Sequence, residues 1–295
     1  MPMQLLNSPA KVNLILDILF KRSDGFHEVD FVMQELELHD TIIIHPRGEP
    51  ASIRIQCSDS SIPTDEKNLA FKAVQVMQEV FVQKNPGKKA PGIEIVLDKK
   101  IPSAGGLGGG SSNAGTVLKA LNAAWALNLS KQALAEKAAV LGSDAPFFIY
   151  GGTCRAQGRG EKITPIEPCP ALFLAFVVPP IHVPADKTKW IYSHFRVENV
   201  SMHPSVERMR AAIHSHSMES VAREMGNAFE FLKLPEYLPV FQEIEKIKRV
   251  PGVLNAILAG AGPTICAVCE SQIIAQKLVH SYTEKSWKAF ATRTA

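Results

Sequence analysis

Five glycines and two serines fill seven of the eight positions from Gly105 to Ser112. Glycine contributes no side chain to a core and loses the most conformational freedom on folding, so packing does not explain the run. Its bare backbone N–H groups can approach a ligand closely, and the ligand that suits such a nest best is an anion, above all a phosphate. The run therefore predicts a phosphate-binding loop.

The segments on either side of the glycine run have the hydrophobic patterns of a strand and of a helix. Apolar residues alternate over residues 93–97 and recur at helical spacing over residues 117–125. A loop in this position feeds a helix N-terminus, where free N–H groups and the helix dipole favour negative charge. A flexible linker is the alternative, but linkers rarely join a strand to an apolar-striped helix.

Three known glycine motifs do not fit the run. A P-loop requires a lysine where Ser111 stands, and the dinucleotide fingerprint requires a glycine at the same position. The glycine loop of the protein kinases accompanies a catalytic His-Arg-Asp sequence, which the chain lacks. The sequence therefore predicts a phosphate loop of another kind.

The composition is that of a globular protein large enough for two domains. The chain has 295 residues, of which 46% are hydrophobic and 21% charged, and its net charge of +3 is too small to favour nucleic acid as a partner. No apolar run is long enough to span a membrane, and the N-terminus lacks the pattern of a signal peptide. Five cysteines favour a reducing, cytoplasmic environment over a disulfide framework. A monomer and a homodimer are both compatible with these numbers.

Hydrophobic periodicity predicts an α+β chain in two parts. The predicted strands cover residues 11–20, 26–38, 41–45, 93–97, 171–178 and 264–269, and the predicted helices cover residues 66–82, 117–125, 130–141, 204–214, 217–232 and 239–249. Ser130 is a suitable N-cap for its helix, and Gly142 a suitable stop. Cys266 and Cys269 have no second pair to complete a zinc site, and we expect them in a buried strand. A region rich in glycine and proline near residues 151–170 predicts domains of residues 1–160 and 161–295.

Two segments outside the glycine run carry polar residues suited to chemistry. Lys11 and Asn13 share one face of the first predicted strand, because side chains repeat every two residues. A lysine at the start of a strand is commonly just exposed to solvent. Asp144, which follows the helix stop, either caps a short helix or acts as a general base near the phosphate loop.

The segment from Arg22 to His27 reads Arg-Ser-Asp-Gly-Phe-His. Asp-Gly is a tight-turn dipeptide, so a plain hairpin turn is one interpretation. The other is that the turn presents Phe26 and His27 to a ligand.

Taken together, these segments resemble the GHMP kinases, which are named after galactokinase, homoserine kinase, mevalonate kinase and phosphomevalonate kinase. The matching segments are SPAKVNLIL at 8–16, RSDGFHEV at 22–29, IPSAGGLGGGSSNAGTVL at 101–118, LGSDAPFF at 141–148 and GAGPT at 260–264. The glycine motif alone indicates only the superfamily. The other segments indicate the branch that acts on diphosphocytidyl-methylerythritol.

The resemblance implies a two-domain α+β GHMP kinase fold, with an N-terminal ribosomal-S5-like α/β domain and a C-terminal ferredoxin-like α+β domain. It implies an enzyme that transfers phosphate from ATP, accompanied by Mg²⁺, to the 2-hydroxyl of diphosphocytidyl-methylerythritol in non-mevalonate isoprenoid precursor synthesis. Two alternatives stay open. One is another small-molecule kinase of the homoserine or mevalonate type, and the other is a catalytically silent nucleotide-binding paralogue.

The resemblance also implies roles for individual residues. Asp144 is expected to accept the proton of the substrate hydroxyl, and Lys11 to orient that hydroxyl and offset developing charge. A nearby cation keeps a carboxylate ionised, and a placed general base contributes roughly a hundred- to ten-thousand-fold in rate. The expected ATP-binding residues are Asn68, Lys99, Pro102, Ser103, Ala104, Gly105, Gly106, Leu107, Gly108, Gly109, Gly110, Ser111 and Ser112. The expected substrate-binding residues are Asn13, Phe26, His27, Thr188 and Tyr192, and no residue is assigned to the metal.

The sequence departs from the family pattern at three positions in or beside the matching segments. Ala259 and Ala261 replace the two serines that are usual in the third glycine motif, so only backbone contacts can be expected there. Phe26 replaces a more usual tyrosine, which keeps the stacking face and removes the phenol.

Overall fold

The computed structural model describes residues 2–103, 105–182, 184, 186–232 and 234–295. The chain divides into two compact units, neither of which is contiguous in sequence. Unit 1 comprises residues 1–10, 38–103 and 108–151, and unit 2 comprises residues 11–37, 104–107 and 152–295. Strands β1 (Gln4–Lys21) and β2 (His27–Arg47) contribute residues to both. The predicted domains of residues 1–160 and 161–295 are a different division of the chain, and they stay a prediction.

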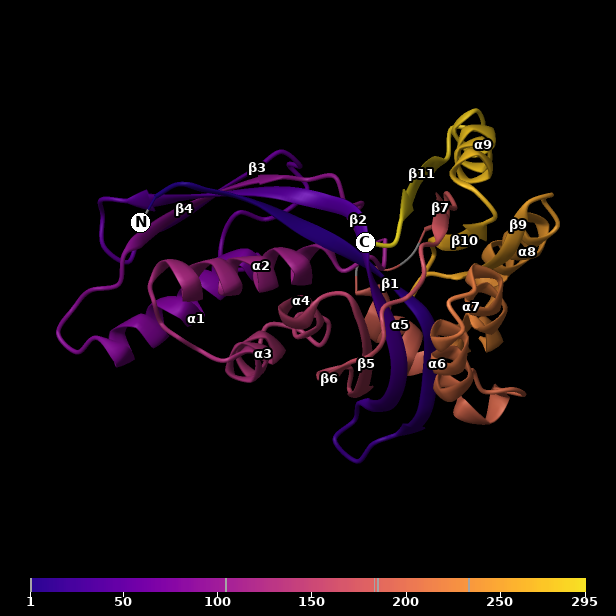
Figure 1. Cartoon of the computed structure of the whole chain (residues 1–295), viewed down its shortest axis with the longest axis horizontal. Helices are drawn as coiled ribbons and strands as arrows, with labels where there is room; N and C mark the ends of the chain where they lie inside the picture. Colours follow the sequence, from indigo (N-terminus) through magenta and orange to yellow (C-terminus); the bar gives the residue numbers. More distant parts are fainter. Residues whose placement is uncertain (1, 104, 183, 185, 233) are drawn as a thin grey trace. The chain divides into compact units, whose positions relative to one another are not determined.

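Unit 1 is a layer of strands covered by helices (Figure 1). Strand β4 (Gly92–Asp98) pairs antiparallel with the second part of β2 and parallel with β3 (Ile53–Cys57). Helices α1 (Leu69–Lys84) and α2 (Gly109–Ala124) lie side by side against these strands, and α3 (Lys131–Ala139) and α4 (Phe147–Tyr150) follow. The inward faces of both layers form one apolar core.

Glycine has a packing role in α2. A Cβ atom on Gly115 would lie 2.8 Å from the Cβ of Phe148, so a larger residue at this position would push α4 away. The helix that carries the glycine run at its start is thus held against its neighbour by close backbone approach.

The two strands predicted at 26–38 and 41–45 are one strand, β2, and the predicted break is wrong. Residues 29–34 pair antiparallel with β5 (Thr153–Gly158) in unit 2, whereas residues 41–47 pair with β4 in unit 1. The polar pair His39-Asp40 gives the sequence the pattern of a break, but Asp40 is fully buried and bound by other polar groups. A tertiary contact therefore overrides the local pattern.

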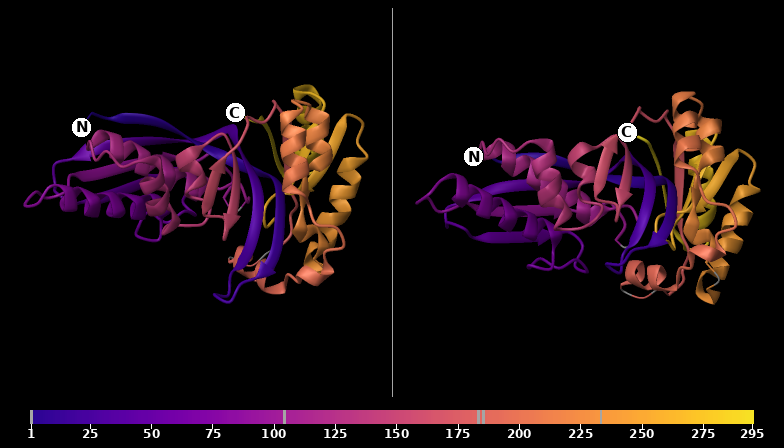
Figure 2. Two further views of the ribbon diagram at one scale, coloured as in Figure 1. Left: turned by 60° about the horizontal axis from the view of Figure 1, so that its bottom comes forward. Right: turned by 90° about the horizontal axis from the view of Figure 1, so that it is seen from below.

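Unit 2 contains a four-stranded antiparallel sheet in the order β11-β7-β10-β9. Its strands are β7 (Phe173–Val178), β9 (Val253–Leu258), β10 (Ile265–Cys269) and β11 (Lys288–Arg293). Helices α8 (Leu238–Lys248) and α9 (Gln272–Thr283) pack against it, with α6 (Val206–His214) and α7 (Met218–Glu224) close to one another (Figure 2). Cys266 and Cys269 are buried in β10 and unpaired, as predicted.

The remaining elements of unit 2 are short. They are β6 (Lys162–Pro165), β8 (Gly226–Asn227), α5 (Lys187–His194) and the 3-10 helices Val197–Asn199, Ala228–Phe231 and Pro235–Tyr237. The helix predicted at 217–232 is wrong beyond Glu224. Met225 follows as its C-cap, and Asn227 instead caps the next 3-10 helix: its side chain accepts a bond from the backbone N–H of Phe229 and donates to the carbonyls of Leu258 and Gly260.

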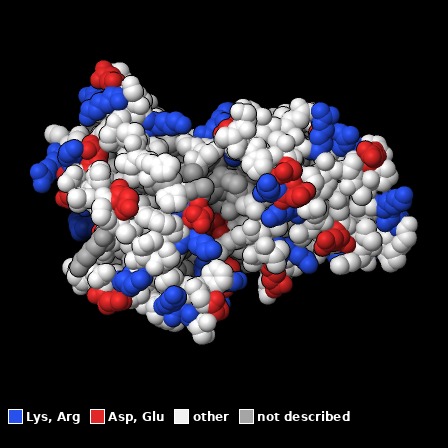
Figure 3. All heavy atoms as spheres, turned by 180° about the vertical axis from the view of Figure 1, so that it is seen from behind, with Lys and Arg blue, Asp and Glu red and all other residues white. Residues whose placement is uncertain are grey.

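Charge is spread over the surface in both signs. On the face drawn in Figure 3, basic and acidic side chains alternate rather than gather in one field. Within the described residues, no helix combines the length and the apolar character needed to cross a membrane.

A partly buried carboxyl in unit 2 makes stability depend on pH. Glu230 accepts a hydrogen bond from the backbone N–H of Leu258, but burial raises the pKa of its carboxyl from the ordinary 4.5 to about 7. Between these two values the unfolded chain releases the proton first, so the free energy of unfolding falls as pH rises through this window, by up to about 3 kcal/mol for this group. Glu230→Gln removes the titration, and we expect it to be more stable than the parent above about pH 7.

Urea unfolding of both proteins at about pH 5 and about pH 8 measures this effect. Glu236→Gln is the matched control, because Glu236 is exposed. A stability difference between Glu230→Gln and the parent that is the same at both pH values would contradict the prediction.

Candidate functional site

Helix α2 begins inside the glycine run, at Gly109, earlier than the apolar spacing alone predicts. Its N-cap is Gly108, which adopts a left-handed conformation with φ of 74° and has no side chain to cap the helix. By contrast, α1 and α3 are capped by the side chains of Asn68 and Ser130. The first turn of α2 also lacks an acidic residue, so its N–H groups and dipole are suited to binding an external anion.

The first part of the glycine run, Gly105 to Leu107, belongs to unit 2. The backbone N–H of Lys11 donates to the carbonyl of Leu107 at 2.9 Å, which ties the loop to β1. Gly106 has φ of +77°, and a Cβ atom there would lie only 2.6 Å from the carbonyl oxygen of Ala259. Glycine is therefore required at this position both for its backbone conformation and for the close approach of the turn that holds Ala259.

That turn, residues 259–263, joins β9 to β10 and is the third glycine motif of the sequence. Side chains bind its carbonyl groups: Asn227 Nδ2 donates to Gly260, Tyr237 Oη donates to Ala261 at 2.8 Å, and Lys187 Nζ donates to Gly262. These three bonds from side chains outside the turn fix its backbone, so the turn keeps its shape without the two serines.

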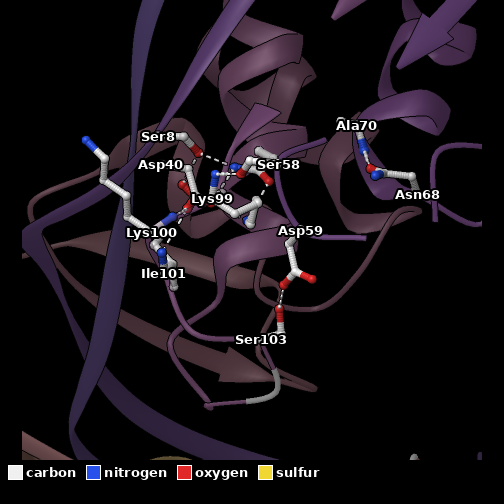
Figure 4. A network of polar contacts seen from close by, with 12 residues as sticks. Ser8, Asp40, Ser58, Asp59, Asn68, Ala70, Lys99, Lys100, Ile101 and Ser103 are labelled. Atoms are coloured by element: carbon white, nitrogen blue, oxygen red, sulfur yellow. Dashed lines mark hydrogen bonds and ion pairs between the residues drawn. The ribbon is translucent and has the colours of Figure 1, made fainter. Parts of the chain in front are cut away.

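Asp40 is the centre of a buried polar network in unit 1 (Figure 4). Its Oδ1 accepts hydrogen bonds from the backbone N–H groups of Lys100 and Ile101 at 2.8 and 2.9 Å. Its Oδ2 accepts bonds from Lys99 Nζ and from Asn113 Nδ2, the latter at 3.0 Å. The carboxylate therefore joins the end of β4 to the first turns of α2.

Ser8 extends this network to β1. Its hydroxyl accepts a hydrogen bond from Asn113 Nδ2 at 2.9 Å and shares a bond of 2.7 Å with the hydroxyl of Ser112. Four separate stretches of unit 1 thus meet beside the start of α2, and the phosphate loop is attached to a rigid polar cluster.

The residues expected to bind ATP have different surroundings. The side chain of Lys99 is 6% exposed and paired with Asp40, and a Cβ atom on Gly109 would lie 3.4 Å from its Nζ, so its charge lies at the start of α2. Asn68 is the N-cap of α1, accepting a bond from Ala70 N at 2.9 Å. Ser103 is exposed and donates to Asp59 Oδ2 at 3.2 Å.

Pro102 is half-buried beside Ser103, and Ala104 lies outside the described residues. The pKa of Asp59 is lowered mainly by hydrogen bonds from the hydroxyl and the backbone N–H of Ser61, with a smaller contribution from Ser103. The segment before the glycine run is therefore tethered to a carboxylate that stays ionised at neutral pH.

Lys11 and Asn13 lie on one face of β1, as predicted, and they are buried rather than exposed to solvent. Lys11 is 3% exposed and Asn13 is 4% exposed, and Lys11 Nζ donates to Asn13 Oδ1 at 3.0 Å. A Cβ atom on Gly260 would lie 4.0 Å from Asn13 Nδ2, so this pair adjoins the third glycine motif. Burial of a lysine is costly unless nearby polar groups or a ligand compensate its charge.

Asp144 lies in unit 1, in a turn between α3 and α4. It is partly exposed and is not the N-cap of α4, which begins after Pro146. The capping interpretation is therefore wrong, and the general-base role stays a prediction. So does the predicted pairing with Lys11, which belongs to unit 2.

The segment from Arg22 to His27 does form a tight turn. Arg22 N donates to the carbonyl of Phe26 at 2.8 Å, Phe26 N donates to Asp24 Oδ1 at 3.1 Å, and Gly25 has φ of +86°. Phe26 is nevertheless 51% exposed, and the guanidinium of Arg159 lies 4.7 Å from its ring centroid. A turn held this firmly presents a large aromatic ring to solvent, which is the arrangement of a stacking platform.

His27 is close to two further aromatic rings. Its ring centroid lies 5.2 Å from that of Tyr192 and 6.4 Å from that of Phe195. Burial, with smaller contributions from the charges of Lys21 and Arg196, lowers the pKa of His27 below its ordinary value, so the imidazole is neutral at pH 7. Thr188 is exposed on α5, one turn before Tyr192.

Three residues that the sequence interpretation did not single out prove central to this geometry. They are Asp40, Asn227 and Lys187. Each binds residues far away in the sequence, so no local pattern marks them. Of the three, only Lys187 lies next to a residue already expected to bind substrate, because it directly precedes Thr188.

Comparison with known proteins agrees with this geometry. The GHMP kinases N terminal domain matches residues 68–152, and the GHMP kinases C terminal domain matches residues 209–288. The chain is 37% identical over 288 residues to the 4-diphosphocytidyl-2-C-methyl-D-erythritol kinase of Geobacillus thermodenitrificans, covering 98% of this chain and 96% of that protein. It is 34% identical over 285 residues to the enzyme of the same name from Clostridium botulinum, covering 97% and 98%.

Solved structures give the same result. A crystal structure of 4-(cytidine 5'-diphospho)-2C-methyl-D-erythritol kinase superposes with a TM-score of 0.76 at 28% identity, covering 98% of each chain. Homoserine kinase from Cytophaga hutchinsonii superposes with a TM-score of 0.71 at 18% identity, covering 100% of this chain and 95% of that one, and supports the fold alone. This chain therefore belongs to the GHMP kinases, in the family of the 4-diphosphocytidyl-2-C-methyl-D-erythritol kinases.

Proposed function

We propose that this protein transfers the γ-phosphoryl group of ATP to the 2-hydroxyl of 4-diphosphocytidyl-2-C-methyl-D-erythritol. The observation that carries the proposal is the combination of an uncapped glycine-rich helix N-terminus with an exposed aromatic ring on a rigid turn. The first feature suits ATP phosphates, and the second suits a nucleobase. Five free cysteines fit the reducing cytoplasm as the place of the reaction.

ATP binds with its phosphates on the glycine run. Backbone N–H groups at the start of α2 donate to phosphate oxygens, and the ammonium of Lys99 adds positive charge beside them. Asp40 holds Lys99 and the first turns of α2 in fixed positions, so the cradle is formed before the nucleotide arrives. Asn68 lies at the start of α1 and is proposed to contact the adenine side.

The acceptor binds through its cytidine diphosphate group in unit 2. Phe26 stacks on the cytosine ring, and the neutral imidazole of His27 both donates and accepts hydrogen bonds on the base edge. Tyr192, already in contact with His27, is the second aromatic wall, and Asn13 and Thr188 bind the polar middle of the substrate. A homoserine or mevalonate molecule has no base for these residues to recognise.

Asp144 is the general base and Lys11 the assisting cation. The carboxylate of Asp144 takes the proton of the acceptor hydroxyl as the hydroxyl oxygen forms a bond to the γ-phosphorus, and the bond to the β-phosphate oxygen breaks to release ADP. Lys11 donates to the attacking oxygen and offsets its developing charge. The remaining task in phosphoryl transfer is positioning and charge neutralisation, which the glycine run performs.

The Mg²⁺ ion that accompanies ATP fits the oxygen donors of unit 1. Within the described residues no cluster of three or more His, Cys, Asp or Glu is present. Mg²⁺ does not need one, because it keeps several waters and takes most of its other ligands from phosphates. Ser111 would hold it, because its hydroxyl lies in the first turn of α2, the helix whose start is proposed to take the ATP phosphates. When bound, the ion neutralises charge on the transferring phosphates.

A substrate panel tests the proposal. Purified protein with ATP and Mg²⁺ receives diphosphocytidyl-methylerythritol, homoserine or mevalonate, and ADP release is measured. We expect turnover with the first alone. We also expect Phe26→Ala to raise the KM of that substrate about 5- to 100-fold, the size of one base–aromatic stacking contact, with the KM of ATP unchanged.

Phe26→Tyr is the matched control, because it keeps the stacking face, and we expect it to behave like the parent. Turnover with homoserine or mevalonate alone would overturn the choice of acceptor. ADP release with none of the three would identify a catalytically silent protein.

A further inference from the structure

A second buried lysine lies beside the proposed acceptor site. Lys187 is the first residue of α5, and only 7% of its surface is exposed. Its Nζ donates to the carbonyl of Gly262 in the turn between β9 and β10. The next two residues of the helix, Thr188 and Lys189, are exposed, so Lys187 is the residue of this segment that points inward.

The turn that Lys187 contacts also borders the phosphate loop and β1. A Cβ atom on Gly260 would lie 3.5 Å from the carbonyl oxygen of Gly106 and 4.0 Å from Asn13 Nδ2. Lys11 binds that same Asn13 through its side chain. Lys187, the Lys11–Asn13 pair and Gly106 are therefore all adjacent to the turn at residues 259–263 in unit 2.

The electrostatics of this region favour an anion. Burial, with a smaller contribution from the positive charge of Lys11, lowers the pKa of Lys187 from 10.5 to about 8. Two ammonium groups that repel each other at low exposure are costly, and a phosphate between them converts the repulsion into two charge-assisted hydrogen bonds.

We propose that Lys187 is a second lysine, beside Lys11, that binds a phosphate oxygen of a substrate. The proposal rests on the proposed function, because that function supplies the phosphate. Two sources share this chemistry: the terminal phosphate of ATP and the diphosphate of the acceptor. In either case Lys187 strengthens binding of the phosphate and offsets negative charge that develops in the transition state. The carbonyl of Gly262 orients the ammonium of Lys187.

Binding and kinetics of three variants test the proposal. Lys187→Met keeps the length of the side chain and removes the charge, Lys187→Arg keeps the charge, and Lys189→Met is the exposed control on the same helix. Each protein is titrated separately with a non-hydrolysable ATP analogue plus Mg²⁺ and with diphosphocytidyl-methylerythritol, and the midpoint of thermal unfolding is followed. The KM of each substrate and kcat are then measured.

We expect Lys187→Met to bind one of the two ligands about 10- to 100-fold more weakly, with a smaller ligand-induced rise in unfolding temperature. Its stability without ligand does not decide the question, because the variant removes both a buried charge and the bond to Gly262. Lys187→Arg should recover part of the affinity, and Lys189→Met should match the parent. A purely structural lysine would leave both affinities unchanged.

The two ligand arms identify the source of the phosphate. Weaker binding of the ATP analogue alone assigns the contact to ATP, and weaker binding of the acceptor alone assigns it to the diphosphate. Parent-like affinity of Lys187→Met for both ligands overturns the proposal. Failure of the parent to turn over the acceptor would instead contradict the proposed function, and the ATP-analogue arm would still test Lys187.

Discussion

Replacing Asp144 with asparagine is expected to lower kcat at least about a hundredfold while ATP still binds. Asparagine has the size of aspartate but cannot accept the proton of the acceptor hydroxyl. The predicted loss is therefore in the chemical step, and the affinity for a non-hydrolysable ATP analogue and the KM of both substrates should change little. Steady-state ADP release together with calorimetric titration of the analogue measures the two effects separately.

Ser143→Ala is the matched control for this experiment. Ser143 is the exposed neighbour of Asp144 in the same turn, so a change there reports on disturbance of the turn alone. We expect parent-like turnover from it. Near-normal turnover by Asp144→Asn would remove Asp144 from the role of base, and equal losses in both variants would point to the shape of the turn instead.

Asp40→Asn is expected to cause the largest loss of stability, about 3–5 kcal/mol in the free energy of unfolding. In the native protein Oδ2 of Asp40 accepts bonds from Lys99 Nζ and Asn113 Nδ2. An asparagine that keeps the two backbone bonds of Oδ1 must place its NH₂ group against these two donors. The ammonium of Lys99 then stays buried without its carboxylate. Urea unfolding measures the loss.

Two further variants separate the causes of this loss. Asp98→Asn changes an exposed carboxylate at the end of β4 and should shift the free energy of unfolding by no more than about 0.5 kcal/mol. Adding Lys99→Met to Asp40→Asn removes the uncompensated charge and should restore part of the stability. If Asp40→Asn costs no more than Asp98→Asn, the network does not hold the start of α2 as inferred.

The sequence predicted those features of the site in which a residue acts on its own backbone or on near neighbours. The glycine run from Gly105 to Ser112 predicted a phosphate loop because each glycine leaves its backbone N–H group uncovered by a side chain. Asp24 and Gly25 predicted the tight turn, and Ser130 predicted a helix cap, which accepts a bond from Ala133 N at 3.1 Å. In each case the residue acts on its own backbone or on a neighbour within a few positions.

Errors arose where distant residues decide the local structure. The break predicted near Asp40 is instead the middle of β2, and the helix predicted through 232 ends before Asn227. Both residues are polar, and polar residues inside an apolar pattern favour a loop when only neighbours are considered. Buried partners from other segments satisfy them here, and those partners are unknown until the chain has folded.

The sequence by itself therefore determined that the glycine run lies between a strand and a helix, and it carried the prediction of a phosphate loop and the resemblance on which the proposed acceptor rests. Only the tertiary structure placed Lys187 on the turn at Gly262 and Asp40 between Lys99 and Asn113. The physical reason is the range of the interactions. Backbone conformation is set by neighbouring residues, whereas the stability of a buried charge depends on partners that folding brings from 59 to 75 positions away.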